Sequence, residues 1–570
     1  MHRRDFCKLA AVGAGAASLL KADQALASSA LSAAADSSDS YPVSEWNALI
    51  QGRNFEANGG KVLPGTWNGV PLESPFPGLN GDGPYQPNWD SMMQYEVPEW
   101  YRDAKFGIWA HWSPQCVAEA GDWYARFMYV QGDRRYRHQC DHFGHPSKFG
   151  YKDLCAQWTM LNWEPEVLIE RYKKAGAKLF LALANHHDGF DTWDSKHQPW
   201  NSKNIGPHRD VIGDWAGAAR RQGLRFGVTV HSARNWWWQR VARICDKTGP
   251  LAGVPYDGHL RLADGKGQWW EGYDPELLYG RKHGLHEEPD TPYVRNFYDR
   301  VRDLIDQHDP DLLYFDDALL PLGWAGMNIG AYFYNHNLKT HGGNMEAVLN
   351  IKLVPDHLAK AVVADYERGV TDHIMPHVWQ SETCIGDWHY NRKVFLDHTY
   401  MKPAQAIHWL IDAVSKNGTF ILNIPGLPDG TIDADESAVL DALANWLGVN
   451  GEAIYATRPW QVFGESTGEI HPTQNQKGAP KFKRGDIRFT RSKRGDVVHA
   501  IVLGWPEGDV MVRSFAKGVV SNPGKVEHVQ LLGSEEKLTW RQTEEGLLLK
   551  PPTHHPTEDY AAAFKVTLSR

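Results

Sequence analysis

Histidine and aspartate residues follow several short apolar runs of this chain. Four of them each close such a run: His111, His186, His231 and Asp316. The run from Lys178 to Asn185 is followed by His186 and then directly by His187. Imidazole and carboxylate groups can bind a metal ion, or they can donate and accept hydrogen bonds for a polar ligand.

The adjacent pair of His186 and His187 argues against a metal site. Metal-binding histidine pairs on a helix usually lie at positions i and i+4, and no third ligand follows this pair at a metal-typical spacing. Recognition of hydroxyl groups at the top of a strand explains the pair better. A metal-dependent hydrolase that uses His111, His186, His187 and Asp316 is the alternative.

Carboxylates form the second group of candidates. Asp316 and Asp317 end the apolar run "DLLYFDD", where a buried carboxylate needs hydrogen-bond donors or a chemical role. Asp316 continues the strand and is expected to point inward. Three further acids follow: Asp365, Glu367 and Glu382. A carboxylate pair in an aromatic-rich pocket suits glycoside hydrolysis, in which one group attacks or directs water and the other protonates the leaving oxygen.

The elements that must position these residues alternate from Trp100 onward. Apolar runs such as "KFGIWAHW" and "AKLFLALANHHDG" alternate with amphipathic stretches such as "WEPEVLIERYKKAG" and "DVIGDWAGAARRQG". This alternation predicts a parallel sheet with helices, and its length of about 350 residues fits a (β/α)8-type barrel. In such a barrel the strand ends open on one face, so the four residues that close apolar runs should converge on one pocket.

Four segments are expected along the chain. Residues 1–27 resemble a twin-arginine-type export signal, because Arg3 and Arg4 precede a weakly apolar stretch that ends in a small-x-small motif. Residues 28–94 are rich in Ser, Ala, Gly and Pro and predict an irregular lead-in. Residues 95–452 should form the catalytic barrel. Residues 453–570 carry short alternating runs, which predict a C-terminal antiparallel β-sandwich.

Composition limits the partners. The formal charge of -9 is spread along the chain without a basic block, which argues against nucleic acid or an anionic membrane surface as partner. Beyond the signal no segment approaches the roughly 20 apolar residues of a membrane helix, so we expect no membrane insertion and a periplasmic location. The 25 Trp residues suit stacking on the apolar faces of sugars. The five cysteines after Cys7 show no CxxC spacing and predict free thiols. The oligomeric state is not predicted.

Several longer motifs carry a family resemblance. They are "WYRDAKFGIWAHW", "ANHHDGFDTWDS", "DLLYFDD", "WQSETCIGDWHYN", "AVSKNGTFILNIPGLPDGTI" and "AIYATRPW". Their order resembles that of the α-L-fucosidases of glycoside hydrolase family 29, over roughly residues 95 to 460. The resemblance implies a retaining exo-hydrolase that releases terminal α-linked L-fucose from fucosylated glycans. It also implies a barrel with a C-terminal β-sandwich and no metal or other cofactor.

The resemblance assigns roles by position. Asp316 of "YFDD" matches the catalytic nucleophile. Residues that match the sugar pocket are His111, Trp123, His186, His187 and Trp388, of which Trp388 is expected to pack near the sugar methyl group. Asp122 stands where many members have Glu, and this shorter acid reaches less far or binds through water.

Two further positions depart from the family pattern. Thr229, Val230 and His231 stand where many members read "YYS", so a tyrosine contact is absent and His231 is expected to replace it. Lys352 of "LNIK" stands where the family commonly has Arg. Lys352 is therefore expected to bind the substrate; it keeps the charge but cannot form a bidentate fork. These departures also permit an alternative function, a carbohydrate-binding protein that has lost catalysis.

Glu367 matches the family acid/base best, and Asp365 and Glu382 remain alternatives. In double displacement Asp316 attacks the anomeric carbon while Glu367 protonates the leaving oxygen, which requires carboxyl groups about 5 to 5.5 Å apart. The long segment of residues 236–280 is expected either to shape the leaving-group side or to pack on itself. Its candidate stacking residues are Trp236, Trp237, Trp238, Trp269 and Trp270.

Overall fold

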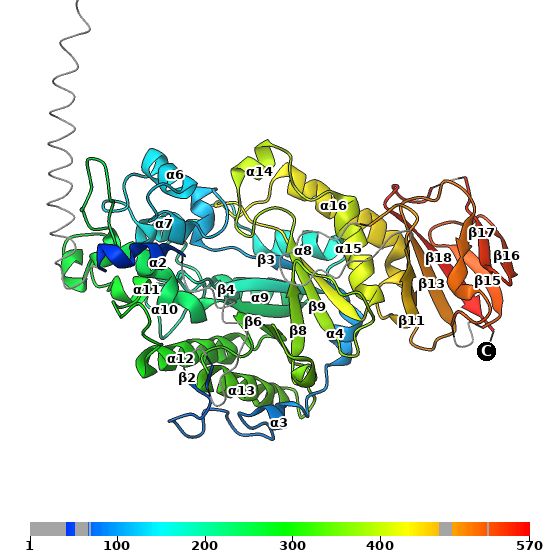
Figure 1. The fold of residues 1–570 in the computed structure, drawn as a ribbon, viewed down its shortest axis with the longest axis horizontal. Helices are drawn as coiled ribbons and strands as arrows, with labels where there is room; N and C mark the ends of the chain where they lie inside the picture. The colour runs from blue at the N-terminus through cyan, green and yellow to red at the C-terminus, as the bar shows by residue number, and fades with distance from the viewer. Residues whose placement is uncertain are drawn as a thin grey trace, which may run out of the picture.

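The computed structural model describes residues 41–51, 66–67, 70–466, 482–520, 524–553 and 555–569 of the chain (Figure 1). The expected export signal, residues 1–27, lies outside the described residues. Eight parallel strands close into a barrel, and two antiparallel sheets of five and three strands follow it. The expected fold class, a (β/α)8-type barrel with a C-terminal β-sandwich, is therefore confirmed.

The barrel strands follow one another around the wall in chain order, and the last pairs with the first. They are β3 (Phe106–Ala110), β4 (Leu179–Asn185), β5 (Arg225–Val230), β6 (Leu312–Ala318), β7 (Val348–Lys352), β8 (Val363–Glu367), β9 (Trp379–Cys384) and β10 (Gly418–Asn423). Every residue of β3, β4, β9 and β10 is buried. Parallel strands are covered on both faces, which is why their sequences are nearly continuous apolar runs.

Helices cover most of the barrel wall. They are α8 (Pro165–Lys174), α9 (Val211–Arg221), α12 (Thr291–His308), α13 (Trp324–Thr340), α14 (Arg392–Leu396), α15 (Pro403–Ser415) and α16 (Ala434–Asn450). Two connections depart from the regular alternation. Only the turn η8 (Asp356–Leu358) joins β7 to β8, and residues 368–378, all described, join β8 to β9 without a helix.

The segment before the barrel contains only short elements in its described part. These are η1 (Val43–Glu45), α2 (Trp46–Gln51), β1 (Thr66–Trp67), β2 (Val70–Pro71), α3 (Trp89–Met92) and α4 (Glu99–Ala104). The Tyr95 ring stacks on Tyr334 of α13 at a centroid distance of 4.6 Å. Its hydroxyl donates to the Ala347 carbonyl just before β7. The part of the segment around α3 and Tyr95 is therefore held against the barrel wall beside α13 (Figure 1).

Long connections build one end of the molecule. Between β3 and β4 lie η3 (Pro114–Ala118), α5 (Tyr124–Phe127), α6 (Arg134–His142) and α7 (Tyr151–Gln157). Between β5 and α12 lie η4 (Ser232–Arg234), α10 (Asn235–Trp238), η5 (Gln239–Arg243), η6 (Asp257–His259), η7 (Leu262–Gly265) and α11 (Glu276–Tyr279). We call residues 231–290, which hold this second group, the insert.

Two buried aspartates of the insert join it to the connection between β3 and β4. Asp246 accepts hydrogen bonds from the hydroxyls of Tyr136 and Tyr256. Asp257 accepts from those of Tyr129 and Tyr279. Each pair of donors satisfies a carboxylate that would be costly to bury alone. A long connection with few regular elements is thereby held in one shape.

The sandwich follows α16 and the turn η9 (Gly451–Ala453). Its larger sheet holds β11 (Arg458–Glu465), β12 (Ile487–Arg491), β13 (Val497–Leu503), β18 (Ala561–Leu568) and β15 (Val526–Leu531), in that spatial order. The smaller sheet holds β14 (Val510–Val512), β17 (Gly546–Lys550) and β16 (Thr539–Thr543), with the turn η10 (Arg513–Phe515) beside them. A separate apolar core lies between the sheets.

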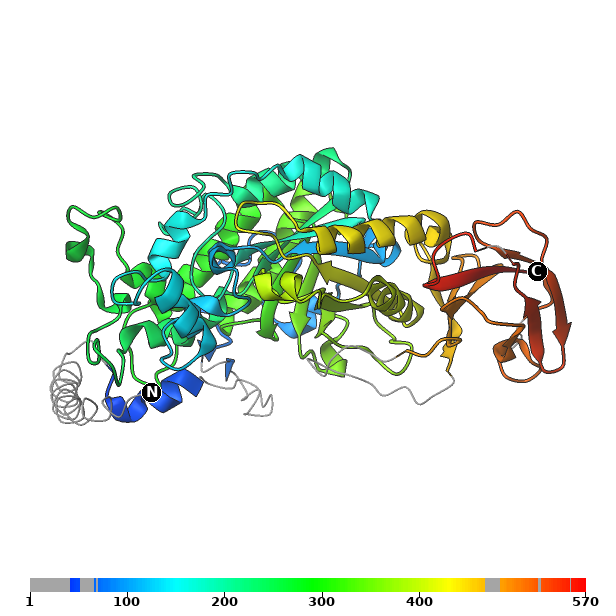
Figure 2. The same ribbon diagram turned by 90° about the horizontal axis from the view of Figure 1, so that it is seen from above.

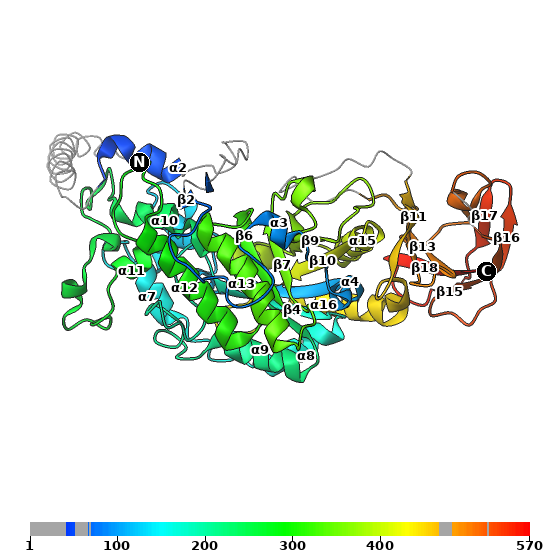
Figure 3. The ribbon, with the colours of Figure 1, turned by 90° about the horizontal axis from the view of Figure 1, so that it is seen from below.

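Helix α15 joins the sandwich to the barrel. Its Asp412 accepts from Lys416 Nζ at 2.8 Å and from Nε of Arg488, on β12, at 2.6 Å. The three side chains are almost completely buried. Viewed from above and from below, the sandwich and the insert lie at opposite ends of the molecule (Figures 2 and 3).

Two further observations bear on the sequence expectations. The five cysteines that the structure describes form no disulfide. Among the described helices, none is long and apolar enough to cross a membrane.

Candidate active site

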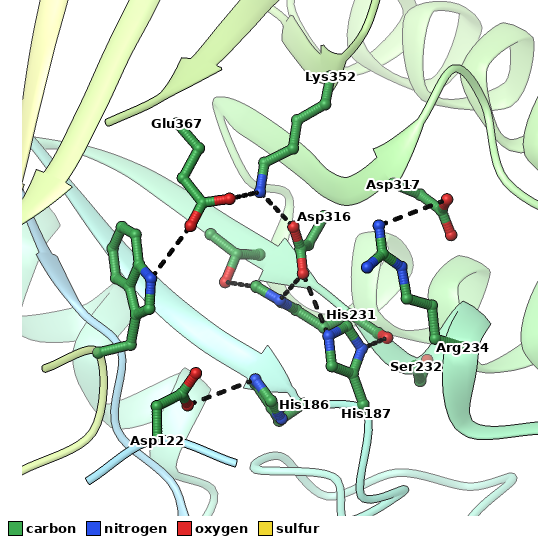
Figure 4. Close-up of polar contacts among 12 residues, drawn as sticks. Asp122, His186, His187, His231, Ser232, Arg234, Asp316, Asp317, Lys352 and Glu367 are labelled. Carbon is green, nitrogen blue, oxygen red and sulfur yellow. Dashed lines mark hydrogen bonds and ion pairs between the residues drawn. The ribbon is translucent and has the colours of Figure 1, made fainter. Parts of the chain in front are cut away.

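The carboxyl ends of the barrel strands bring the expected site residues together (Figure 4). His111 follows β3, His186 and His187 follow β4, and His231 follows β5. Asp316 lies near the end of β6, and Lys352 and Glu367 are the last residues of β7 and β8. Asp122, Trp123 and Trp388 reach the same place from the connections after β3 and β9.

Asp316 lies among three nitrogen groups. Its Oδ2 lies 3.0 Å from His231 Nδ1 and 3.3 Å from His187 Nε2. Its Oδ1 contacts the ammonium group of Lys352. Burial alone would raise the pKa of Asp316, but Lys352 and His231 outweigh burial and hold this pKa well below its usual value. The carboxylate is therefore ionised at neutral pH.

Lys352 connects two carboxylates. Its Nζ contacts Asp316 and also lies 2.6 Å from Glu367 Oε2. The other oxygen of Glu367 accepts a hydrogen bond of 3.2 Å from Nε1 of Trp388. In Figure 4 the ammonium group lies between Asp316 and Glu367. A lysine suits this position because its three donors can serve two carboxylates at once.

The two alternative acids lie elsewhere. Asp365 precedes Glu367 by two residues on the same face of β8 and is therefore one step deeper in the barrel. Glu382 lies two residues before the end of β9. The exposed fractions of Asp365 and Glu382 are 2% and 1%, against 8% for Glu367. Glu367 is thus the most exposed of the three acids.

Hydrogen-bond partners define the orientation of His186. Its Nδ1 lies 2.9 Å from Nε2 of Gln115, an amide nitrogen that can only donate. The same nitrogen donates to Asp188 Oδ2 at 2.8 Å, which fixes the amide orientation. The hydrogen of His186 is therefore on Nε2, which lies 3.8 Å from Asp122 Oδ1. Burial holds the pKa of His186 well below its usual value, so the ring is neutral.

His187 and His231 are fixed in a similar way. Nδ1 of His187 donates to the main-chain oxygen of His231 at 2.7 Å, which leaves Nε2 directed at Asp316. Nε2 of His231 lies 3.2 Å from the Thr229 hydroxyl. Burial lowers the pKa of His231 to about 4, so this ring is neutral at pH 7. Asn185 accepts from the main-chain nitrogen of His231 and helps to hold it.

His111 differs from the other rings. It is 3% exposed, and neither ring nitrogen has a hydrogen-bond partner among the described residues. Its main-chain nitrogen donates to Oδ1 of Asn423, at the end of β10. A buried imidazole without partners carries a desolvation cost unless a ligand supplies the missing hydrogen bonds. The ring therefore offers a donor and an acceptor to a bound hydroxyl group.

A metal ion was the alternative use of these rings. Ligand atoms of His111, Asp122, His186 and His389 lie within 4.8 Å of one another, so distance alone would permit an ion. The hydrogen on His186 Nε2 opposes this, because a metal-bound nitrogen must offer its lone pair. Gln115 would have to turn its donor away from both His186 and Asp188. The hydrogen bonding therefore favours hydroxyl recognition.

Aromatic residues form the wall of the pocket. Trp123 is 37% exposed and adopts a left-handed conformation with φ of 61°. Its ring stacks on Phe127 and meets His187 and Trp238 edge to face. A bulky residue in this conformation is strained, and such strain is concentrated at functional sites.

The insert contributes to this wall. Trp238 also contacts His186 and His187, with centroid distances of 5.6 and 5.7 Å. Four of the five expected stacking rings are buried, namely Trp236, Trp237, Trp238 and Trp270. Trp269 is 47% exposed and is held by a hydrogen bond to Asp153.

Sequence analysis missed the residues that hold the site together. Nδ1 of His389 donates to Asp122 at 2.7 Å, and its Nε2 lies 2.8 Å from the Ser113 hydroxyl. Asn423 donates to the main-chain oxygen of Trp388 in addition to holding His111. His389 directly follows Trp388 in the sequence, and this adjacency was an available signal. Nothing in the sequence indicated Gln115.

Comparisons with known proteins agree with the expected family. A family model described as alpha-L-fucosidase matches residues 79–452, and one described as alpha-L-fucosidase C-terminal domain matches residues 481–567. Tissue alpha-L-fucosidase of Bos taurus is 28% identical over 499 residues, which cover 85% of this chain and 91% of that protein. The Homo sapiens protein of the same name is 27% identical over 499 residues, covering 85% and 92%.

Solved structures give the same result. The alpha-fucosidase of Thermotoga maritima in complex with fucose is 25% identical, with a TM-score of 0.64. The match covers 85% of this chain and 100% of that chain. Alpha-L-fucosidase isoenzyme 1 from Paenibacillus thiaminolyticus, at 17% identity and a TM-score of 0.58, shares the fold. The family resemblance stated from the motifs is confirmed.

Proposed function

Since the chain belongs to the α-L-fucosidase family of glycoside hydrolases, we propose that it removes terminal α-linked L-fucose from fucosylated glycans by double displacement, with retention of configuration. The observation that carries this proposal is the shared lysine. One oxygen of Asp316 and one oxygen of Glu367 both contact Lys352 Nζ. The two oxygens therefore lie no farther apart than the sum of these two contact distances. This supports the separation of about 5–5.5 Å of retaining enzymes rather than the about 6.5–9.5 Å of inverting enzymes.

In the first step Asp316 is the nucleophile. Its carboxylate forms an ester bond with the anomeric carbon of fucose, while the bond from that carbon to the glycosidic oxygen breaks. Glu367 gives its proton to the departing oxygen. In the second step water attacks the anomeric carbon, its proton passes to Glu367, and Asp316 is released as a carboxylate.

The Lys352 ammonium group stays close to the negative charge during both reaction steps. Before the first step the charge is on Asp316, and after it the charge is on Glu367. The ammonium group contacts both carboxylates, so it stabilises the charge at either position without moving far. Preorganised charge of this kind lowers a barrier because no reorganisation is needed during the reaction.

The imidazole rings are proposed to bind the fucose hydroxyls. His186 presents an N–H and Asp122 a carboxylate oxygen, while His111 lacks partners in the described part of the chain. This set provides donors and acceptors side by side, as a sugar hydroxyl requires. The rings of Trp123 and Trp388 would cover the apolar face and the methyl group of the sugar.

Hydrolysis of 4-nitrophenyl α-L-fucoside tests the proposal. We expect wild type to turn over and Asp316→Gly to lose at least about a thousandfold in kcat/KM, because the nucleophile is absent. Azide should rescue Asp316→Gly with an inverted β-fucosyl azide as product. With Glu367→Ala, azide should instead attack the fucosyl-enzyme and give the α-fucosyl azide.

Asp317→Asn is the matched control, because Asp317 is adjacent in sequence. Asp317 accepts from the main chain of Ala318 and lies 4.0 Å from Arg234, so this variant should retain turnover. If Asp317→Asn is dead and Asp316→Gly is active, the nucleophile is wrongly assigned. A wild type that binds fucose but hydrolyses no fucoside would instead support the alternative of a binding protein.

Export is a separate proposal that rests on residues 1–27. The order of Arg3, Arg4, the weakly apolar stretch and the small residues supports a twin-arginine-type signal and a periplasmic location. Fractionation of cells expressing wild type and Arg3→Lys/Arg4→Lys tests it. The variant should remain in the cytoplasm, and periplasmic recovery of both forms equally would contradict the proposal.

A further inference from the structure

A second pair of acidic side chains lies beneath the catalytic lysine. Asp365 and Glu382 come from neighbouring strands, β8 and β9, and both are almost completely buried. The Tyr314 hydroxyl donates to Glu382 Oε1 at 2.9 Å and lies 3.5 Å from Asp365 Oδ2. Gln380 Nε2 donates to Asp365 Oδ1 at 2.8 Å. The mechanism proposed above uses neither acid.

The surroundings do not neutralise two negative charges at this place. Lys352 Nζ lies 3.9 Å from Glu382 Oε1, while its close contacts are with Asp316 and Glu367. Glu382 Oε2 is buried without a hydrogen-bond partner in the described part of the chain. One ammonium group thus faces four acids, and a buried carboxylate without a counter-charge keeps its proton.

Titratable and polar groups face the pair from four strands and from α4. They are Tyr314 and Asp316 on β6, Lys352 on β7, Glu367 on β8, Gln380 on β9 and Tyr101 on α4, whose hydroxyl donates to Gln380. Burial raises the pKa of Asp365 to about 7, although Lys352 acts in the opposite direction. Burial, and then the charge of Asp365, raise the pKa of Glu382 well above its usual value.

We propose that Asp365 and Glu382 hold one proton between them during catalysis and act as positioning residues, which keep the Lys352 ammonium group directed at Asp316 and Glu367. This inference rests on the function proposed above. While the pair keeps its proton, Glu382 offers the lysine only a weak dipole. When the proton leaves, Glu382 becomes a full negative charge close to the ammonium group and competes with the catalytic carboxylates.

In a profile of kcat against pH, the alkaline limb is the fall in kcat at high pH. Substitutions at the two acids should shift this limb in opposite directions. Glu382→Gln imitates the protonated acid permanently, so the loss of activity at high pH should move upward by at least about one pH unit. Asp365→Asn removes the negative neighbour that makes Glu382 keep its proton. Glu382 then ionises at lower pH, and the alkaline limb should move downward.

Profiles of kcat against pH for wild type and both variants form the first part of the test. We expect Glu382→Gln to keep kcat within about threefold of wild type at the acidic side of the optimum, because its shape and neutrality match the protonated acid. If the two acids had a purely structural role, both variants would lower kcat at every pH. The alkaline limb would then shift in the same direction in both variants, or it would not shift. Either of those results would overturn the proposal.

The second part does not depend on activity. A buried protonated carboxyl group gives a C=O stretching band in the infrared spectrum, separate from that of ionised carboxylates. Wild type should show this band at neutral pH and Glu382→Gln should lose it. The exposed control Glu544→Gln, whose side chain is 85% exposed, should keep both the band and the wild-type limb.

The two readouts separate the two proposals. If wild type shows a band that Glu382→Gln removes but hydrolyses no fucoside, the shared proton is real and the proposed function is wrong. If wild type hydrolyses the fucoside but shows no band that Glu382→Gln removes, the proposed function stands and the shared proton is refuted.

Discussion

Five imidazole rings gather at the mouth of this barrel, yet their neighbours give them different properties. Centroids of neighbouring rings lie between 4.4 and 5.7 Å apart. Gln115 leaves His186 a donor, and the main-chain oxygen of His231 fixes the hydrogen on His187. The hydrogen-bond partner of one ring nitrogen therefore decides what the other ring nitrogen can offer to a ligand. The presence of a histidine alone does not reveal this.

A substitution at His111 should separate binding from stability. In His111→Leu the fold should keep or gain stability, because a buried imidazole without partners is replaced by an apolar side chain of similar size. Activity should fall about 10- to 100-fold in kcat/KM, the value of one or two hydrogen bonds to substrate. Thermal unfolding and fucoside kinetics on the same preparation provide the check.

His186→Leu is the matched comparison for this prediction. It removes the partner of Gln115 and should therefore lower stability as well as activity. A His111→Leu variant that unfolds as readily as His186→Leu would show that His111 is a structural residue.

At the residue scale, the ends of apolar runs indicated His111, His186, His231 and Asp316. The other positions, such as Trp123, Glu367 and Trp388, were assigned from the family resemblance. The strand pattern alone left Glu367, Asp365 and Glu382 open as the acid/base, since that choice depends on depth in the barrel and on the position of the Lys352 amino group. The family resemblance favoured Glu367. It assigned Lys352 to substrate binding and did not predict that this side chain contacts both carboxylates. The contacts of a long flexible side chain are not readable from a strand pattern.

At the scale of elements, the alternation of apolar and amphipathic runs predicted the barrel correctly. It did not predict that β8 and β9 are joined without a helix. Neither did it predict how the insert is held. The two tyrosines that donate to Asp257, Tyr129 and Tyr279, are far apart in the sequence. No local sequence pattern indicates such a contact.

The insert should open when one of the buried aspartates that join it to the β3–β4 connection is removed. Asp257→Ala leaves the hydroxyls of Tyr129 and Tyr279 without their acceptor, at a local cost of about 1–3 kcal/mol for each buried group left unpaired. Limited proteolysis should then cut within residues 231–290. KM should rise, because Trp238 would no longer be held against His186 and His187.

Asp264→Ala serves as the control within the same insert. Asp264 is exposed and caps the short turn η7, so its loss should cost about 0.5–2 kcal/mol at most and leave the distant wall intact. Equal proteolysis of both variants, or of neither, would contradict the role given to Asp257.

For the whole molecule, the buried contact between α15 and β12 decides how the barrel and the sandwich unfold. Arg488→Met removes one of the two cations that face Asp412. Breaking a buried ion pair in this way costs about 3–5 kcal/mol. Urea unfolding should show a lower midpoint or two separate transitions, whereas the exposed control Lys517→Met should stay within about 0.5 kcal/mol of wild type.

The same contact gives a dependence on pH with a definite sign. Burial alone would raise the pKa of Asp412, but Lys416 and Arg488 hold it below its ordinary value. A carboxyl group of this kind stabilises the fold above the pKa of the unfolded chain, and this stabilisation is lost as the pH falls through the lower folded pKa. Arg488→Met should therefore show a smaller loss of stability in acid than wild type, beginning from a lower value.

The placement of the insert and the sandwich at opposite ends of the molecule has a practical consequence. Trp238 of the insert lies against the site residues His186 and His187, while the C-terminal strand β18 belongs to the sandwich at the other end of the molecule (Figure 1). A bead or electrode that captures the protein by a tag after β18 would hold it by the end remote from the pocket. Captured in this orientation, the enzyme should act on glycans that are themselves fixed to a second surface.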